Sequence, residues 1–212
     1  MKYLRIPKET VRRLPFYLRG LLRLSDEGVT RVSSQDVAGL LGVKPWLVRK
    51  DLSYFGDFGK PGVGYDLAEL IQHIRAILKL DRANRAVLVG AGSLGSALLE
   101  FPGFEKYGLE IAFAFDCDPQ RIGGRIGGVV IEDVAHLASV EQRDVNLGIV
   151  AVPQQVAQEV VDTLVHAGIK GLLSFSSLYI VAPDDVKVLT IDIAMDLARL
   201  PYYLSSPREK KS

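Results

Sequence analysis

Six consecutive residues near the middle of the chain have the types and spacing with which a backbone binds phosphate: Gly90, Ala91, Gly92, Ser93, Leu94 and Gly95. They follow the apolar run 86–89 and precede a segment with helical apolar spacing, which is the context that a G-x-G-x-x-G pattern requires. The first glycine permits a tight turn, the second lets the backbone approach a pyrophosphate, and the third lets helix and strand pack closely. The helix N-terminus would face the anion. We therefore expect these six residues to bind a dinucleotide.

A carboxylate stands where such sites hold a ribose. The apolar run 111–115 ends at Asp116, 21 positions after Gly95. A carboxylate there accepts hydrogen bonds from ribose hydroxyls and repels a 2′-phosphate, so the pattern favours NAD(H) over NADP(H). Arg121 and Arg125 weaken this inference slightly, because either could pair with a phosphate.

The rest of this half alternates short apolar runs with helical segments, which is typical of a doubly wound parallel sheet, the Rossmann type, over residues 81–190. The carboxyl ends of parallel strands share one crevice, where the nicotinamide half of the ligand would lie. Strand ends therefore supply the further residues expected to bind the cofactor: Cys117, Asp118, Val152, Pro153, Ser174 and Phe175. Cys117, the single cysteine, is expected to be a small buried residue.

A dehydrogenase also needs a proton donor or acceptor beside the nicotinamide. His73, His136 and His166 all fall on predicted helices, and no cluster of metal-ligand residues is present. We therefore expect no catalytic residue and no metal site, and we interpret the nucleotide as an effector instead of a co-substrate.

The N-terminal part differs in charge from the remainder. Residues 1–80 hold 14 basic and 8 acidic side chains, against 12 and 17 in residues 81–212. Helical spacing of apolar residues predicts a first helix after Pro7, ending near 26–28, with Val11, Leu14, Leu18, Leu21 and Leu22 on its apolar face. A capping box of Ser33 and Asp36 opens a second helix, which ends at Gly42.

A third helix is predicted from Pro45 to about Phe55. Its inner face holds Val48, Leu52 and Phe55, and its outer stripe holds Trp46, Arg49, Lys50 and Ser53. Arginine, lysine and serine can donate to base edges or phosphates in a major groove, which fits the second helix of a helix-turn-helix. Asp51 points toward the buried flank, where we expect a structural ion pair. The alternative is a solvated helix in a small helical domain.

The segment 56–65 is too rich in glycine for a helix, and Pro61-Gly62 suits a type II turn. We expect a small hairpin, a wing, with Lys60 at its tip for the minor groove or a phosphate; the alternative is an ordinary surface loop. A fourth helix, capped by Asp66 and Glu69, closes this predicted winged helix-turn-helix domain of residues 1–80. The N-terminus lacks an apolar leader and no run approaches roughly 18 apolar residues, so we expect a cytoplasmic protein.

The order of these parts resembles the Rex family of redox-sensing repressors. The most specific stretches are 49–56 and 62–65, and the glycine pattern, 115–119 and 167–171 agree in order and spacing. The resemblance implies a homodimer that binds double-stranded palindromic operator DNA while NAD⁺ dominates and is released when NADH accumulates. It also implies that the helix expected at 192–203, in a C-terminal dimerisation segment 191–212, is exchanged between subunits.

The resemblance further implies a switch network of Arg19, the residue at 101 and Asp192. The family often has tyrosine at the second position, where this chain has Phe101, so the network would lack a hydroxyl. Ser174-Phe175-Ser176-Ser177 and Pro61 also depart from the usual pattern. Two alternatives stay open: an NAD-dependent oxidoreductase with an accessory basic domain, and a DNA-binding protein whose ligand is a CoA-type or other nucleotide.

Overall fold

The computed structural model describes residues 6–59, 62–176 and 179–205. The chain divides into two compact units, Met1–Arg82 and Ala83–Ser212. The segment 191–212, expected as a separate C-terminal part, is grouped with the second unit. Among the described residues, no helix is both long enough and apolar enough to span a membrane.

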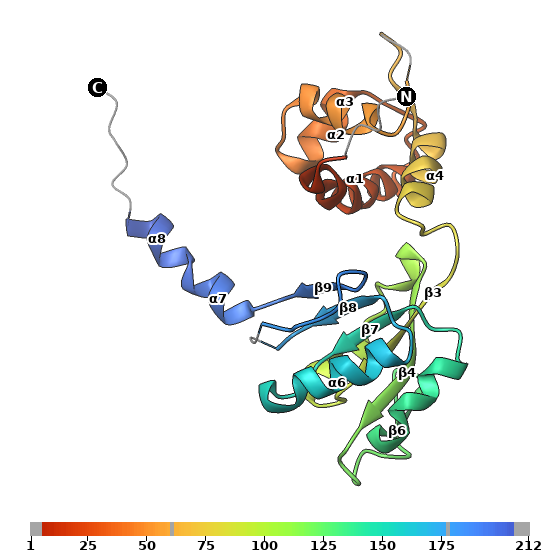
Figure 1. Ribbon diagram of the computed structural model, residues 1–212. Coiled ribbons are helices and arrows are strands. Elements are labelled where there is room, and N and C mark those ends of the chain that lie inside the picture. The colour runs from red at the N-terminus through yellow and green to blue at the C-terminus, as the bar shows by residue number, and fades with distance from the viewer. Residues whose placement is uncertain (1–5, 60–61, 177–178, 206–212) are drawn as a thin grey trace. The chain divides into compact units, whose positions relative to one another are not determined.

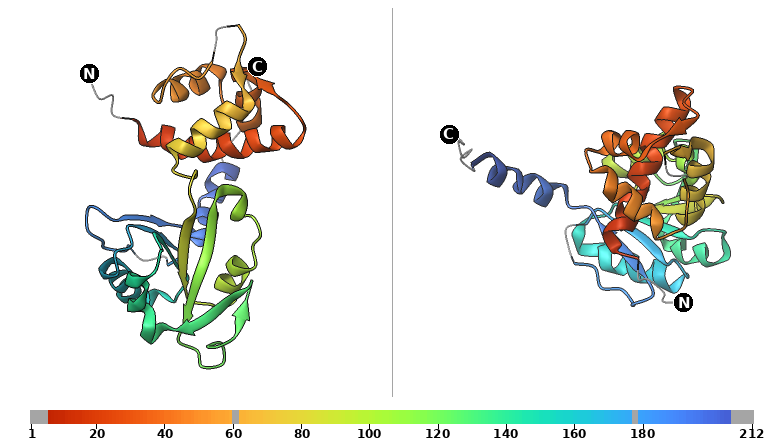
Figure 2. Two further views of the ribbon diagram at one scale, coloured as in Figure 1. Left: turned by 90° about the vertical axis from the view of Figure 1, so that its right-hand side faces the viewer. Right: turned by 90° about the horizontal axis from the view of Figure 1, so that it is seen from above.

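The first unit consists of four helices and one small sheet. The elements are α1 (Lys8–Asp26), β1 (Arg31–Val32), α2 (Ser34–Leu41), α3 (Pro45–Ser53), β2 (Tyr65–Asp66) and α4 (Leu67–Ile77). The left view of Figure 2 shows α4 lying alongside α1. Leu14, Leu18 and Leu21 of α1 are buried, as are Val48 of α3 and Ile74 of α4. Burial of one apolar face from each helix holds this unit together.

The predicted caps are present. Ser33 accepts hydrogen bonds from two backbone N–H groups and Asp36 completes the capping box, while Gly42 ends α2 with φ of 64°. Asp66 caps α4 by accepting the N–H of Glu69. α3 begins at Pro45 as expected but ends at Ser53, slightly earlier than predicted.

One expectation for this unit was wrong, and another is only partly covered by the described residues. The strand of the wing, β2, pairs antiparallel with β1, which precedes α2, so this ladder joins distant segments. The hairpin expected within 56–65 stays a prediction, because its residues 60–61 lie outside the described residues. Val11 is exposed, whereas Thr10 and Tyr17 of the same helix are buried. The reason is that both buried residues bond to Asp51, which draws their side of α1 toward α3.

The second unit is built on a seven-stranded sheet in the order β5-β6-β4-β3-β7-β8-β9. The strands are β3 (Asn84–Val89), β4 (Leu109–Asp116), β5 (Arg125–Ile126), β6 (Val129–Asp133), β7 (Leu147–Val150), β8 (Gly171–Ser174) and β9 (Lys187–Thr190). All neighbours pair in parallel except β5 and β6. The order reverses at β3, which creates the crevice typical of a dinucleotide-binding sheet. This arrangement confirms the predicted parallel Rossmann-like fold (Figure 1).

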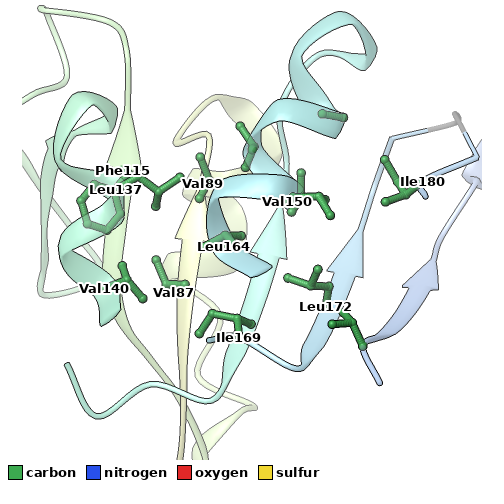
Figure 3. Packing of buried hydrophobic residues seen from close by; sticks show 14 residues of the cluster. Val87, Val89, Phe115, Leu137, Val140, Val150, Leu164, Ile169, Leu172 and Ile180 are labelled. Carbon is green, nitrogen blue, oxygen red and sulfur yellow. The ribbon is translucent and has the colours of Figure 1, made fainter. Parts of the chain in front are cut away.

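Alternate residues of the strands pack into two cores. Val87, Val89 and Phe115 face α6 (Gln154–His166) and the 3₁₀ segment η2 (Val134–Gln142), in the cluster drawn in Figure 3. Ala86 and Leu88 belong to a second core, which includes Leu99 of α5 (Ser93–Leu99). This alternation follows from the two-residue period of a strand, and it leaves both faces of β3 dry.

The C-terminal helix expected at 192–203 is divided into α7 (Ile193–Ala198) and α8 (Leu200–Ser205). The two meet at Arg199, two positions before Pro201. Proline has no backbone N–H to continue a helical ladder, which accounts for a break at this point. The β5–β6 hairpin and the short 3₁₀ helix η1 (Glu105–Tyr107) were not predicted.

Candidate functional site

The glycine turn between β3 and α5 has the shape that a dinucleotide needs. A side chain at Gly90 would lie 2.5 Å from the carbonyl oxygen of Ala151, and one at Gly95 would collide with the carbonyl oxygen of Gly90. Both glycines are therefore required by the fold. A side chain at Gly92 would meet only the Arg121 guanidinium, 4.0 Å away, so the backbone at Gly92 borders open space. That open space beside a helix N-terminus is what a pyrophosphate would fill, so the residues present fit the ligand.

Asp116 ends β4 and is 6% exposed. Its Oδ2 accepts the backbone N–H of Ala91 at 2.7 Å and a guanidinium N–H of Arg121 at 3.2 Å, and its Oδ1 accepts the N–H of Asp118 at 2.9 Å. Burial alone would raise the pKa of Asp116, but these hydrogen bonds outweigh it and hold the pKa below its usual value. The carboxylate is thus charged at neutral pH and tied to the glycine turn.

A cavity of ≈ 790 Å³ lies at the carboxyl edge of the sheet. Among the predicted residues its lining includes Gly90, Gly92, Asp116, Cys117, Asp118, Val152 and Pro153. The other predicted residues stand elsewhere. Ser93 and Leu94 begin α5, Ser174 is fully buried, and Phe175 packs against the second core. Cys117 is exposed, not buried as expected, because the chain leaves the sheet just after Asp116.

Of the remaining lining residues, the sequence pointed to two: Ala151, in the strand-end segment expected to line the crevice, and Arg121, as a possible phosphate partner. The others were not predicted: Val89, Val134, Ala135, Leu137, Val156, Glu159, Val160 and Thr163. Several come from α6 and η2, which face the cavity beside the strand ends. One signal for them can be read from the sequence: the helix directly after Pro153 carries apolar residues at 156 and 160, four positions apart, on one face.

In the first unit, α3 presents the predicted outer stripe to solvent. Trp46 is 52% exposed, and Arg49, Lys50 and Ser53 are exposed. The Arg49 guanidinium donates to the Ser34 hydroxyl at 2.8 Å, which holds it beside the first turn of α2. Ser53 donates to the carbonyl oxygen of Lys50. Lys60, expected at the wing tip, lies outside the described residues.

A groove of ≈ 470 Å³ runs between α3 and the wing segment. Its lining includes Ser33, Ser34, Arg49 and Ser53, together with glycines of the wing. Hydroxyls and a cation along a concave surface are groups that bind phosphate oxygens. Two helices and a wing strand place these groups together, although they lie up to 20 positions apart in sequence.

The inner side of α3 is fixed by Asp51, which is 1% exposed. Its carboxylate accepts two hydrogen bonds from Arg13, at 2.6 and 2.7 Å, and one each from Thr10 and Tyr17. Burial raises the pKa of Asp51, but the bonds from Arg13, Tyr17 and Thr10 lower it by more. Burial also raises the pKa of Tyr17 well above its ordinary value. The expected structural ion pair of Asp51 is thus present, with α1 as its partner.

The three residues of the implied switch are divided between the two units: Arg19 belongs to the first, and Phe101 and Asp192 belong to the second. Arg19, on α1, lies over the Phe16 ring with 5.4 Å between the guanidinium carbon and the ring centre. Phe101 is 54% exposed and makes an edge contact with Phe104, and Asp192 caps α7 by accepting the N–H of Met195. Their joint role stays a prediction.

Comparison with known proteins agrees with both halves of the structure. A family model described as "Putative DNA-binding protein N-terminus" matches residues 5–53, and one described as "CoA binding domain" matches residues 81–178. The solved structure of RSP in complex with β-NAD⁺ and operator DNA has a TM-score of 0.88 and 34% identity, covering 94% of this chain and 92% of that one. RSP in complex with β-NADH has a TM-score of 0.84 at 32% identity, covering 94% of each chain.

Curated relatives match over almost their whole length. The redox-sensing transcriptional repressor Rex of Chloroflexus aurantiacus is 44% identical over 204 residues, which is 96% of each chain. That of Desulforamulus reducens is 43% identical over 206 residues, covering 97% of this chain and 98% of the relative. With such identity over nearly the full chain, and with the helical unit and the Rossmann sheet in the same order, this protein belongs to the Rex family of redox-sensing transcriptional repressors, which is not a family of enzymes.

Proposed function

We propose that this chain represses transcription as a homodimer that holds operator DNA through α3 and is released when NADH occupies the second unit. One observation carries the proposal: a single chain combines two features. The helix α3 exposes a cationic stripe and is bonded to α1 through Asp51, and the second unit has a cavity lined by the glycine turn and Asp116. RSP, a relative of the same architecture, has been crystallised with NAD⁺ and operator DNA and with NADH.

In the first unit, α3 is the element that enters the major groove. Trp46, Arg49, Lys50 and Ser53 are the residues that we assign to DNA contact, with Lys60 as a wing contact. The exposure of the first four supports this assignment, as does the basic excess of residues 1–80. Phosphate contacts provide most of the affinity, and base contacts provide the sequence preference.

In the second unit, we assign the glycine turn to the pyrophosphate and Asp116 to the adenosine ribose. Val152 and Pro153, just after β7, then line the nicotinamide end, beside Val156. An apolar surround disfavours the charged pyridinium ring of NAD⁺, because desolvating a charge is costly, and disfavours the neutral ring of NADH much less. The ligand is an effector: it changes the population of protein states and is not consumed.

Two features support a homodimer. The helices α7 and α8 expose a row of large apolar side chains, Ile193, Leu197, Leu200 and Leu204, of which Leu204 is 84% exposed. One face of the sheet also carries an apolar groove of ≈ 430 Å³ lined by residues of β3, β4, β7, β8 and β9. Exposed apolar surface of this extent marks an interface. We propose that residues 191–212 are exchanged between subunits, and that the two-fold dimer matches a palindromic operator.

The direct test is operator affinity at varied NADH to NAD⁺ ratio with total nucleotide held constant. The duplex is one that the protein itself selects from a random pool, and binding is followed by fluorescence anisotropy. We expect affinity to fall as the NADH fraction rises, by the coupling factor that links the two ligands. Equal affinity at every ratio would refute the switch.

The CoA-type alternative deserves its own measurement, since the matching family model carries that description. Titration of the protein with NADH, NAD⁺ and coenzyme A separates the two ligand classes. We expect NADH to bind most tightly, because the Asp116 carboxylate accepts hydrogen bonds from unmodified ribose hydroxyls and repels a phosphate on the ribose. Tighter binding of coenzyme A would reassign the pocket.

A further inference from the structure

We propose that Arg121 is a second determinant of nucleotide selectivity, which pairs with Asp116 in the free protein and is the group that would bind a phosphate on the adenosine ribose. The inference rests on the proposed nucleotide function and concerns one residue of that site. It predicts that the preference for NADH over NADPH is set by the pairing of the two side chains, and not by Asp116 alone.

The position of Arg121 is fixed by a tight turn after β4. Its backbone N–H donates to the carbonyl oxygen of Asp118 at 2.9 Å, which brings its side chain back toward the strand end. Its guanidinium lies 3.2 Å from Asp116 Oδ2 and 3.6 Å from Asp118 Oδ2. The side chain is 43% exposed and lines the cavity, next to the open space at Gly92. A cation therefore stands within the site at its adenosine end.

The hydrogen bonds of Asp116 show what a ribose must displace. A carboxylate oxygen accepts about two hydrogen bonds. Oδ2 already accepts from Ala91 and Arg121, whereas among the described residues Oδ1 accepts from Asp118 alone. Two ribose hydroxyls that donate to this carboxylate need two free positions, and the second becomes free when Arg121 leaves Oδ2. Ribose binding thus releases the guanidinium at the very place where a 2′-phosphate would stand.

Charge then explains why the free guanidinium does not admit NADPH. Asp116, Asp118 and Arg121 together carry two negative charges and one positive charge, so a phosphate meets a net repulsive site. Removal of the Asp116 carboxylate leaves the single charges of Asp118 and Arg121, which cancel. It also removes the closest partner of the Arg121 guanidinium. A guanidinium binds phosphate oxygens in a bidentate manner with strong, charge-assisted hydrogen bonds. The altered site should accept a 2′-phosphate.

The experiment measures Kd for NADH and NADPH by calorimetric titration of the full chain. Asp116→Ser is compared with Asp116→Ser/Arg121→Gln and with Asp116→Ser/Arg125→Gln. Arg125 is the matched control, because it lies four positions from Arg121 and donates instead to the carbonyl oxygen of Gly128. We expect Asp116→Ser to tighten NADPH binding by about tenfold or more, which is about 1.4 kcal/mol per factor of ten. Arg121→Gln should abolish that gain, and Arg125→Gln should preserve it.

Folding is checked by the thermal unfolding of each variant. Should Asp116→Ser unfold at a much lower temperature, Asp116→Asn keeps the shape of the side chain, removes only its charge and carries the same prediction. A wild-type chain that binds neither nucleotide contradicts the proposed function itself. A wild-type chain that binds NADH, combined with a gain in NADPH affinity that survives Arg121→Gln, overturns the inference alone. So does the lack of any gain in a folded Asp116 variant.

Discussion

Arg13 of α1 and Asp51 of α3 form a bidentate ion pair, with N to O distances of 2.6 and 2.7 Å. The pair lies on the inner side of α3, the helix assigned to DNA contact. The Asp51 side chain is 1% exposed and the Arg13 side chain 25% exposed. All four hydrogen bonds to Asp51 come from α1, so the inner side of α3 is fixed by polar contacts as well as by Val48 and Leu52. The exposed stripe on the outer side therefore has a defined orientation.

We predict that Asp51→Asn lowers the free energy of unfolding of the first unit by about 3 kcal/mol, the low end of the range for breaking a buried pair, since Arg13 keeps some contact with water. Trp46, the single tryptophan, lies on α3 and reports this transition by its fluorescence in urea. Asp57→Asn is the matched control, because Asp57 is exposed in the same unit. Its effect should stay within about 0.5 kcal/mol. Equal effects of the two substitutions would contradict a structural role for the pair.

The same pair predicts a pH dependence. The pKa of Asp51 in the folded protein lies below its ordinary value of 3.8, so the carboxylate favours the folded state when it is charged. Its contribution is complete above 3.8 and is lost as the pH falls through the lower, folded value. The difference in urea midpoint between wild type and Asp51→Asn should therefore be largest near neutral pH and shrink in acid. A difference that does not change with pH would show that the lost shape, and not the lost charge, matters.

Arg49 is predicted to contact a phosphate. Its guanidinium is held by Ser34 beside the first turn of α2, a place that favours anions. Arg49→Gln should weaken binding to operator and to random duplex by a similar factor, and should reduce the slope of log affinity against log salt by about 1. Lys50→Gln is the comparison, since Lys50 neighbours Arg49 on the exposed stripe. A change in base preference, without a change in the salt slope, would instead identify Arg49 as a base-reading residue.

The elements that were predicted correctly from the sequence have strong local signals. The capping box at Ser33, proline at the start of α3 and the glycine turn before α5 each dictate backbone geometry on their own. The pairing of β1 with β2 was missed because it joins residues more than 30 positions apart, and two-residue strands leave no periodic pattern. In the site, Asp116 was predicted from its sequence separation from Gly95, which is 21 positions. The contact of Arg121 with Asp116 depends on the turn at 118–121, which spacing alone does not specify.

The glycines of the turn allow folding and ligand binding to be separated. Gly92→Ala should leave thermal unfolding nearly unchanged, because φ at Gly92 is −65° and the added carbon meets nothing closer than 4.0 Å. It should weaken NADH binding by about tenfold or more, since the methyl group occupies the space through which the pyrophosphate approaches. Gly95→Ala is the contrasting variant: its methyl group collides with the backbone at Gly90, so it should destabilise the second unit itself. Wild-type NADH affinity in Gly92→Ala would place the pyrophosphate elsewhere.

The exposed apolar row on α7 and α8 predicts where association can be broken. Leu197 is 64% exposed, so Leu197→Asp costs the isolated chain little, yet it would bury a charge in the proposed interface. We expect this variant to sediment as a monomer at concentrations at which the wild type sediments as a dimer. Ala198→Asp places the same side chain at an exposed position of α7, about 100° around the helix from Leu197 and off the apolar row, and should remain dimeric. Because two half-sites bind together only in the dimer, Leu197→Asp should also lose most of its affinity for a palindromic duplex while keeping that for a single half-site. A dimer that survives Leu197→Asp would require the subunits to meet through the sheet face instead.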